Sequence, residues 1–300
     1  PKPNPEIYLR IFIEFGIYPS EAIIIEDSHY GREAAISSGA KLLPIKKVSE
    51  LSLNKIKSNI FIKKKINKKS ILWEDSKMNV LIPMAGAGKR FVDAGYVFPK
   101  PLIEIDNKPM IQWVIESLKL DANYIFIIQK EHQVKYNIKS VLRILKPNCN
   151  IIELDHVTEG AACTTLLAKK FINNSNPLII ANSDQYISWN SSKAIYDFNS
   201  KNLDGAILTF EAIHPKWSYA KCDDEGFVTE VAEKKVISKN ATVGVYYWKH
   251  GSDYVQSAEK MIRKNIRVNN EFYVCPVYNE FLLKKKYVKI HEVDKMHGLG

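Results

Sequence analysis

One segment, NVLIPMAGAGKRFVDAGYVFPKPLIEI at residues 79–105, constrains the fold of this chain more than any other. It begins with an almost continuous apolar run, which is typical of a buried strand. Gly86 and Gly88 come directly after this run. Three cations follow the glycines: Lys89, Arg90 and Lys100. Because glycine lets the backbone approach a ligand and turn its N–H groups toward an anion, the segment predicts a buried strand that ends in an anion-binding turn.

Two better-known phosphate motifs do not fit this turn. A Walker P-loop requires GxxxxGK[ST], but Arg90 follows Gly88-Lys89, and Pro83 occupies the position of the first glycine. A dinucleotide fingerprint requires GxGxxG, but Phe91 occupies the position of the third glycine, which should pack the helix against the strand. The turn therefore belongs to neither class.

The cations around the turn are suited to a triphosphate. The planar guanidinium of Arg90 can bind two phosphate oxygens, and Lys100 supplies a compact charge. Pro99 and Pro101 restrict the backbone on either side of Lys100, so we expect its ammonium to be held in one direction. A surface turn with solvated cations is the simpler alternative. The combination favours a site that stabilises charge developing on a phosphorus centre.

The rest of the chain from Met78 alternates short apolar runs with helical patterns. We expect strands at 79–84, 124–129, 150–154 and 177–182, and helices at 109–119, 131–145, 160–173 and 190–199. This alternation predicts an α/β fold with a doubly wound, mostly parallel (Rossmann-like) sheet. Beyond residue 205 we expect mainly strands, at 206–212, 219–223, 227–234 and 242–249, with a hairpin turn at 224–227.

The N-terminal part reads as a separate piece. Residues 1–45 predict helix, strand, helix and strand, which is too little to close a stable sheet and suggests the end of a larger domain. We divide the chain into residues 1–50, a lysine-rich linker at 51–77 and a domain at 78–300. The linker holds eight lysines and two acids, a net charge of +6 within a total of +10. It is either a solvated linker or a polyanion-binding arm.

Composition excludes several other classes of protein. The apolar runs are too short to span a bilayer, and no secretion signal opens the chain, so we expect a cytoplasmic protein without a membrane partner. RNA-binding signatures are missing, so no nucleic acid partner is expected. The four cysteines and seven histidines are scattered, which favours free thiols over a disulfide or zinc framework.

With its PKPL segment, the glycine turn resembles the signature of the sugar-phosphate nucleotidyltransferases, the NDP-sugar pyrophosphorylases. The resemblance covers residues 78–300, and Lys89 departs from the Ser or Thr that many members have. It implies transfer of a nucleoside monophosphate from a triphosphate to a sugar 1-phosphate or similar phosphorylated acceptor, with Mg2+ and release of pyrophosphate. It also implies catalytic roles for Arg90, Lys100 and Asp184. The nucleotide-binding residues it implies are Ala85, Gly86, Ala87, Gly88 and Lys89.

Further segments match the family in order. TEGAACTTLLA resembles the part that meets the nucleobase, with Glu159 and Gly160 as candidates, although it also reads as a helix start rich in small residues. ANSDQYI places Asp184 after an apolar strand, where members hold magnesium. No basic residue is close to Asp184 in the sequence, so we expect its carboxylate to be held mainly by the metal.

The acceptor side is implied by three later segments. VAEKK resembles the Glu-Lys pair that contacts the sugar phosphate, here Glu233 and Lys234. TVGVYYW resembles the strand whose glycine, Gly244, leaves room for the sugar. Residues 269–279 lack the second metal-binding aspartate of many members. Glu271 or Asn279 substitutes for it, or one ion suffices. We also expect Glu271 among the acceptor-binding residues.

Residues 1–45 carry a second resemblance. KPNPEIY and IIIEDSHYGREAAISSGA are similar to the last two motifs of the haloacid dehalogenase-type (HAD) phosphatases. This implies phosphate binding by Lys2 and magnesium binding by Asp27. The DxDG[TV] segment with the family's nucleophile is absent, so residues 1–50 resemble the C-terminal fragment of such a domain. An unrelated βαβ unit is the alternative.

Three functions compete at this point. A nucleotidyltransferase is favoured, and its neighbouring phosphatase piece suggests, by analogy, a pathway for a surface polysaccharide. A phosphatase is disfavoured because its nucleophile is missing. A non-catalytic nucleotide- or sugar-phosphate-binding regulator is favoured only by the missing second aspartate. The sequence does not identify the base, the acceptor or the oligomeric state.

Overall fold

The computed structural model describes residues 3–52, 56, 73–86, 88, 91 and 93–299. The chain divides into two compact units, Pro1–Lys69 and Ser70–Gly300, which are described separately. Within the described residues, no helix has both the length and the apolar character needed to cross a bilayer. Most of the predicted linker lies outside the described residues.

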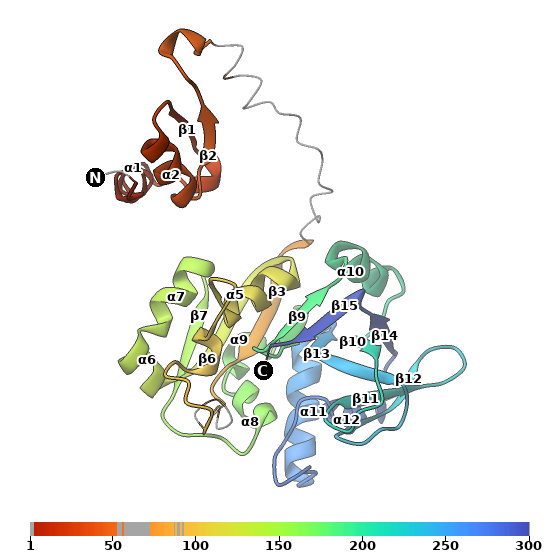
Figure 1. Cartoon of the computed structure of the whole chain (residues 1–300). Coiled ribbons are helices and arrows are strands. Elements are labelled where there is room, and N and C mark those ends of the chain that lie inside the picture. Colours follow the sequence, from red (N-terminus) through yellow and green to blue (C-terminus); the bar gives the residue numbers. More distant parts are fainter. Residues whose placement is uncertain are drawn as a thin grey trace. The chain divides into compact units, whose positions relative to one another are not determined.

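The first unit has the predicted order of helix, strand, helix and strand. Its elements are α1 (Glu6–Phe15), β1 (Ile23–Glu26), α2 (His29–Ser37) and β2 (Lys41–Pro44), drawn in red and orange in Figure 1. The two strands pair in parallel. A small core forms around Phe12, Ile24 and Ala35. The Ser28 hydroxyl begins α2 by accepting a hydrogen bond from the Gly31 amide, as an N-cap should.

A large sheet organises the second unit (Figure 1). Its strands are β3 (Trp73–Pro83), β6 (Leu120–Gln129), β7 (Asn150–Leu154), β8 (Leu178–Ala181), β10 (Gly205–Glu211), β11 (Ser218–Cys222), β12 (Val228–Glu233), β13 (Asn240–Trp248) and β14 (Val288–Glu292). The main strand order is β12-β11-β13-β8-β3-β6-β7, and β10 joins β13 to β14. The pairs β8–β3, β3–β6 and β6–β7 are parallel, as predicted, and β13 joins β8 in antiparallel fashion.

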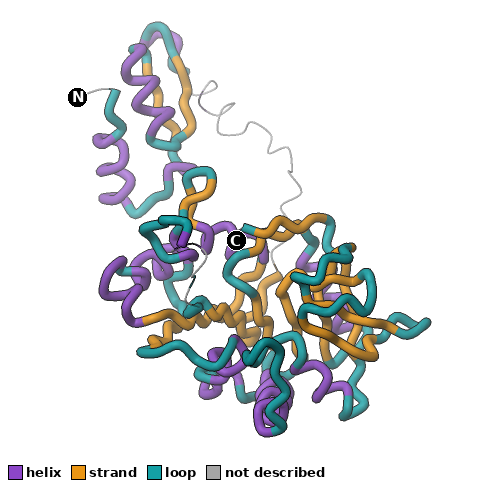
Figure 2. The backbone as a smooth tube through the Cα atoms, turned by 60° about the horizontal axis from the view of Figure 1, so that its bottom comes forward, coloured by secondary structure: helices purple, strands orange, loops and turns teal. Residues whose placement is uncertain are grey.

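Helices pack on both faces of this sheet, as Figure 2 shows by the purple segments on either side of the orange strands. They are α5 (Met110–Leu118), α6 (Lys130–Tyr136), α7 (Ile138–Leu145), α8 (Ala161–Leu166), α9 (Lys169–Ile172), α10 (Ser191–Ser200), α11 (Gly251–Arg263) and α12 (Val277–Leu282). Successive residues of β3 serve two cores: Val80 and Ile82 face one cluster, and Leu81 faces the other. Burial on both faces explains why residues 80–82 of this strand are all apolar.

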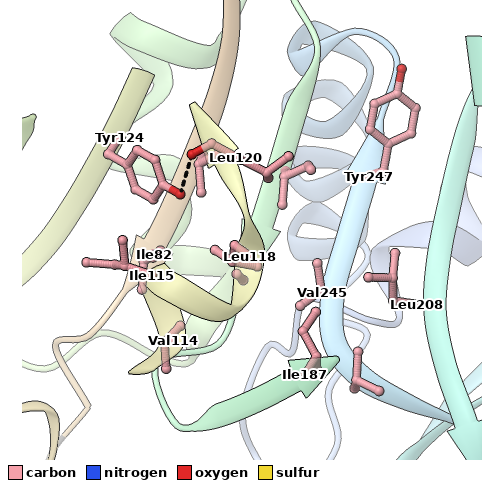
Figure 3. Close-up of a cluster of buried hydrophobic side chains, with 14 of the residues drawn as sticks. Ile82, Val114, Ile115, Leu118, Leu120, Tyr124, Ile187, Leu208, Val245 and Tyr247 are labelled. Atoms are coloured by element: carbon pink, nitrogen blue, oxygen red, sulfur yellow. Dashed lines mark hydrogen bonds between the residues drawn. The ribbon is translucent and has the colours of Figure 1, made fainter. Parts of the chain in front are cut away.

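The first of these cores, shown in Figure 3, joins α5 to the sheet. Val114, Ile115 and Leu118 lie on the buried face of α5. Tyr124 packs in the same cluster, and its hydroxyl donates a hydrogen bond to the carbonyl of Leu120 at 3.2 Å. A buried hydroxyl without a partner is costly, so this bond lets a tyrosine occupy an apolar core.

Several predicted boundaries differ from the structure. The helix expected at 131–145 is divided into α6 and α7 by Asn137, whose φ of 50° is left-handed and interrupts the helix. The helix expected at 160–173 is the two short helices α8 and α9. Strand β3 begins at Trp73 rather than at residue 79, because its pairing with β6 continues past a register shift between Glu74 and Asn79.

The region beyond residue 205 contains more than the predicted strands. The amphipathic helix α11 covers 13 residues, and α12 packs against it. Elsewhere in the second unit, two strands that we did not predict form an antiparallel pair: β9 (Gln185–Ser188) and β15 (Lys295–Gly298). Strand β9 begins directly after Asp184. A further two-stranded pair, β4 (Glu104–Ile105) and β5 (Lys108–Pro109), precedes α5.

Candidate active site

Two residues that are 84 positions apart meet at the carboxyl ends of the parallel strands. Lys100 begins a short 3-10 helix, Lys100–Leu102, and Asp184 follows β8. The Lys100 ammonium donates a hydrogen bond to Oδ2 of Asp184 at 2.5 Å. Their side chains are 17% and 26% exposed, so the pair is mostly shielded from water. The expectation that a metal would be the main partner of the Asp184 carboxylate did not include Lys100, which the structure adds as a partner. Metal binding by Asp184 remains a prediction.

Pro99 and the aromatic ring of Phe91 fix the direction of Lys100. Pro99 has extended backbone angles (φ −62°, ψ 147°), and Pro101 follows at the first positions of the 3-10 helix. The Lys100 ammonium nitrogen lies 5.2 Å from the centroid of the Phe91 ring. A cation over an aromatic face is attracted by the ring, so this contact adds to the ion pair.

The glycine turn borders a cavity of about 330 Å3 next to this pair. Lys100, Gly86, Gly88 and Ser183 are among the residues that line it. Gly88 has a φ of 59°, a left-handed conformation that other residues adopt only with strain. Among the described residues, no atom lies within 4 Å of a Cβ placed at Gly86, so they leave the space above its backbone open. The described part of the turn thus presents backbone to an open cavity, as an anion site requires.

Gln129, at the end of β6, holds this turn from the other side. Its Nε2 donates hydrogen bonds to the carbonyls of Ala85 at 2.9 Å and Gly86 at 3.2 Å. The Ala85 carbonyl and the Gly86 N–H belong to the same trans peptide, in which the two groups point in opposite directions. The Gly86 N–H is therefore directed away from Gln129. We did not predict this residue. A polar side chain at the end of an apolar strand adjacent to β3 was the available signal.

Four predicted residues lie outside the described part of the chain. They are Lys2, Ala87, Lys89 and Arg90. Their roles remain predictions.

A second cavity, of about 500 Å3, is lined in part by Asp184. Asp184, Glu233, Lys234 and Gly244 all line it. The structure thus brings three of the four predicted acceptor residues together around one space, and the fourth, Glu271, is not among the described residues that line it. Since Lys100 lines the first cavity and Asp184 the second, their ion pair stands between the two.

Gly244 lies against two polar side chains that line the cavity, and the room that it leaves for a sugar remains a prediction. Its φ is 72°, and a Cβ atom there would lie 2.2 Å from Nδ2 of Asn182 and 2.5 Å from Oε1 of Gln185. The space next to Gly244 is therefore filled by two side-chain amides of the protein itself. The absence of a side chain at Gly244 allows Asn182 and Gln185, which also line the cavity, to form its floor.

The carboxylate of Glu233 is mostly buried beside the cavity. Burial raises its pKa above the ordinary value, although the Ser218 hydroxyl, which donates a hydrogen bond to it, acts in the opposite direction. Ser218 lines the same cavity. A carboxyl group with a hydroxyl partner is suited to exchanging hydrogen bonds with hydroxyl groups of a ligand.

Lys234 is held by an aromatic partner that we did not predict. Its φ is 54°, and its ammonium donates a hydrogen bond to the Tyr273 hydroxyl at 2.5 Å. Burial acts to lower the Lys234 pKa, but the Tyr273 hydrogen bond and the nearby charges outweigh burial and raise it. Lys234 is therefore a fixed cation at the cavity, suited to an anionic group of a ligand.

The two nucleobase candidates contact the protein itself. The Glu159 carboxylate accepts a hydrogen bond from Arg267. Gly160 has a φ of 131°, and the backbone of Phe272 approaches so closely that a Cβ at Gly160 would lie 2.5 Å from it. The structure therefore assigns these residues packing and pairing contacts, and their contact with a base remains a prediction.

The two suggested substitutes for a second metal-binding aspartate differ in their surroundings. Asn279 exchanges two hydrogen bonds of 2.9 Å with the backbone of Val231, so its side-chain oxygen is already used. Glu271 is exposed and acts electrostatically on Tyr273 and Glu233. Among the described residues, no three acidic, histidine or cysteine side chains gather as a metal cluster. A single carboxylate, Asp184, still fits Mg2+, which commonly binds proteins through one or two carboxylates plus waters and substrate phosphates.

In the first unit, Asp27 follows β1 and is exposed. The adjacent Glu26 is buried and accepts a hydrogen bond from the Tyr8 hydroxyl at 2.5 Å. A Cβ at Gly31 would lie 2.1 Å from the Glu26 carboxylate, so the glycine in α2 makes space for it.

Comparison with known proteins identifies relatives of the second unit. The profile of the Nucleotidyl transferase family matches residues 79–275. The bifunctional protein GlmU of Thermosipho melanesiensis is 27% identical over 230 residues, which cover 74% of this chain and 48% of that protein. The mannose-1-phosphate guanylyltransferase catalytic subunit beta of Drosophila pseudoobscura pseudoobscura is 26% identical over 176 residues, 55% of this chain and 46% of that protein. The chain thus spans about half the length of these relatives.

Solved structures share the fold. A nucleoside-diphosphate-sugar pyrophosphorylase from Vibrio cholerae superimposes with a TM-score of 0.63 at 23% identity, over 73% of this chain and 95% of that one. A UDP-glucose pyrophosphorylase in complex with UDP-glucose gives a TM-score of 0.57 at 17% identity, over 73% of this chain and 92% of that one. At these identities the likeness supports the fold alone.

Proposed function

Because the chain belongs to the Nucleotidyl transferase family, we propose that it transfers a nucleoside monophosphate from a nucleoside triphosphate to a phosphorylated small molecule. A sugar 1-phosphate is the acceptor we favour. The observation that carries the proposal is the Lys100–Asp184 pair, which stands between a cavity beside the glycine turn and a second cavity with Glu233 and Lys234. Two cavities that meet at a cation and a carboxylate suit two anionic substrates that react with each other.

The reaction is a displacement at phosphorus. An oxygen of the acceptor phosphate forms a bond to the α-phosphorus of the triphosphate, and the bond from that phosphorus to the bridging oxygen of pyrophosphate breaks. The second pKa of a phosphate monoester is about 6, so the nucleophile is already mostly dianionic at neutral pH. The protein therefore needs no general base, and catalysis depends on alignment and charge neutralisation.

Each described residue then has a specific role. The glycine turn binds the phosphates of the triphosphate through backbone N–H groups, and Gln129 holds the turn in position. Lys100 neutralises charge on the α-phosphate after it leaves Asp184. Lys89 and Arg90 are proposed to bind the outer phosphates.

Asp184 would hold Mg2+, because its carboxylate offers the oxygen ligands that this hard cation prefers. When bound, the metal would neutralise charge on the reacting phosphate oxygens. With Mg2+ held by Asp184 and a phosphate oxygen bound by Lys100, each member of the pair would have an oppositely charged ligand.

The acceptor is proposed to bind in the larger cavity. Lys234 would meet its negative charge, and Glu233 with Ser218 would meet its hydroxyl groups. Asn182 and Gln185 would contact it from the floor of the cavity. The curated relatives include a mannose-1-phosphate guanylyltransferase by name, which supports a sugar 1-phosphate here. A role in surface polysaccharide synthesis in the cytoplasm remains a proposal by analogy.

The resemblance of residues 1–50 to the end of a HAD phosphatase domain also remains a proposal. Asp27 at the end of β1 is the residue proposed to bind magnesium there. The parallel pair β1–β2 and the helix α2 after Asp27 support a βαβ-type unit.

A screen of substrates tests the proposed function. The protein is incubated with Mg2+, each of the four common nucleoside triphosphates and a panel that includes glucose, mannose and N-acetylglucosamine 1-phosphates and phosphocholine. The account predicts pyrophosphate release that requires both substrates, is strong for one pair and is lost in Asp184→Asn. Pyrophosphate release in no combination would contradict it.

A further inference from the structure

A loop of residues 264–275, which we call the bridging loop, contacts residues 158–162 and also lines the larger cavity. It leaves α11 and turns back on itself where the backbones of Val268 and Glu271 pair. Near its end it carries Tyr273, whose hydroxyl accepts the hydrogen bond from Lys234. Because Tyr273 and Lys234 both line the larger cavity, the position of this loop determines the position of a predicted acceptor-binding cation.

The bridging loop is joined to residues 158–162 backbone to backbone. The Phe272 amide donates to the carbonyl of Glu159, and the Ala162 amide donates to the carbonyl of Phe272, both at 2.9 Å. A side chain at Gly160 would collide with the Phe272 backbone. Gly160 is therefore the residue that permits this contact, and any larger residue there would push the two segments apart.

The side chain of Arg267 also connects the bridging loop to residues 158–162. One terminal nitrogen donates to the Glu159 carboxylate. The other donates to the carbonyl of Asn270 at 3.1 Å, and Nε donates to Oδ1 of Asn265 at 2.6 Å. The carbon at the centre of its guanidinium lies 4.0 Å from the centroid of the Phe272 ring. One planar cation thus contacts the loop at three places and the segment 158–162 at one, which a lysine could not reproduce.

We propose that Arg267 is a positioning residue: by pairing with Glu159, it holds the bridging loop against residues 158–162 and so fixes Tyr273 and Lys234 at the acceptor cavity. This role rests on the proposed function, since it assumes that the cavity receives the acceptor. Glu159 is 67% exposed, and an ion pair so open to water contributes little stability by itself. We therefore expect the pair to act mainly by ordering the loop.

Hydrogen–deuterium exchange without substrate tests whether Arg267 holds the bridging loop against residues 158–162. Arg267→Met keeps an unbranched side chain over Phe272 and removes the charge. We expect the Phe272 and Ala162 amides to exchange together, about tenfold faster than in the wild type, as a local opening would allow. Arg263→Met, which removes an exposed cation from the last turn of α11, should leave both amides unchanged. Unchanged exchange in Arg267→Met would overturn the proposal.

Steady-state kinetics with the most active substrate pair of the screen test the positioning role. Arg267→Met should raise the acceptor KM about tenfold, with kcat changed less than about twofold, because it disturbs binding rather than the reacting phosphates. Glu159→Gln should act in the same way. The double variant should be no worse than Arg267→Met alone, since both changes break one interaction, and Arg267→Lys should recover part of the loss.

Two kinetic outcomes would overturn the role: an unchanged acceptor KM, or additive losses in the double variant. Absence of turnover by the wild-type protein with every pair would instead remove the proposed function and, with it, the positioning role. The exchange measurement needs no substrate. It therefore tests the contact between the bridging loop and residues 158–162 independently of whether the proposed transferase activity is found.

Discussion

The Lys100 ammonium lies 2.5 Å from a carboxylate oxygen of Asp184, although 84 residues separate the two in the chain. The residues expected to contact the reacting phosphate and the magnesium therefore neutralise each other. Because each charge has an oppositely charged partner in a shielded site, neither bears the full cost of burial.

We expect Lys100→Ala to reduce turnover at least about a hundredfold, while the protein remains folded. Removing one preorganised contact to developing charge commonly costs about 10²–10³ in rate. The measurement is kcat at saturating substrates, with circular dichroism as the control for folding. Near-normal turnover in a folded variant would show that Lys100 does not contact the reacting phosphate.

Asp184→Asn should abolish turnover and slightly lower the thermal stability of the protein without metal. Asparagine leaves the Lys100 ammonium without its anionic partner, which we expect to cost about 1–2 kcal/mol for a pair between the exposed and buried extremes. The wild type should gain melting temperature with Mg2+ and triphosphate, because a ligand of the native state stabilises it. The variant should lose most of that gain.

Thermal melts with and without Mg2+ and triphosphate decide this case. A higher melting temperature of the metal-free Asp184→Asn protein would contradict the ion pair. A ligand-induced shift equal to that of the wild type would place the metal elsewhere, and Glu271 would be the next residue to examine.

Gly244→Ala should destabilise the protein by about 1–3 kcal/mol and weaken acceptor binding, because the new methyl group collides with Asn182 and Gln185 and a left-handed backbone disfavours alanine. Gly298→Ala is the matched control: Gly298 lines the same cavity, and a Cβ there would only touch Trp217 at an ordinary 3.8 Å. Urea unfolding and acceptor KM are the measurements. Equal effects of the two substitutions would refute the steric account.

The pH dependence of stability should report on Glu233. Burial raises its pKa in the folded protein, so the folded state binds the proton more tightly than the unfolded state does. Its contribution to stability is therefore complete below the unfolded pKa and is lost as the pH rises through the folded pKa. Glu233→Gln removes this loss. The melting temperature of Glu233→Gln relative to that of the wild type should therefore increase from pH 4 to pH 7. A difference between the two melting temperatures that does not change with pH would count against the buried carboxylate.

Much of this architecture could be predicted from the sequence. The strand at 79–84, the glycine turn and Lys100 were recognisable because an apolar strand, left-handed turns and flanking prolines leave local patterns. Asp184 was found because it follows an apolar strand whose carboxyl end faces a ligand in α/β folds. These signals are local, so the fold of the parallel region and the neighbourhood of the site followed from them.

The contacts that define the site could not be predicted in this way. Three of these contacts join residues from separate elements: Lys100 with Asp184, Gln129 with the carbonyl of Ala85, and Arg267 with Glu159. Nothing in the local sequence pattern indicates the partner. The same holds for the close approach of Asn182 and Gln185 to Gly244, which the sequence around the glycine does not indicate.

The fate of the α-phosphate tests the central claim most directly. The protein is incubated with Mg2+, the active acceptor and a triphosphate labelled in parallel at the α- or the γ-phosphorus. The account predicts that the α-label appears in a nucleoside diphosphate derivative of the acceptor and the γ-label in pyrophosphate, with neither product formed by Lys100→Ala at a comparable rate. Release of the γ-label as inorganic phosphate, or retention of both labels in the triphosphate, would contradict it.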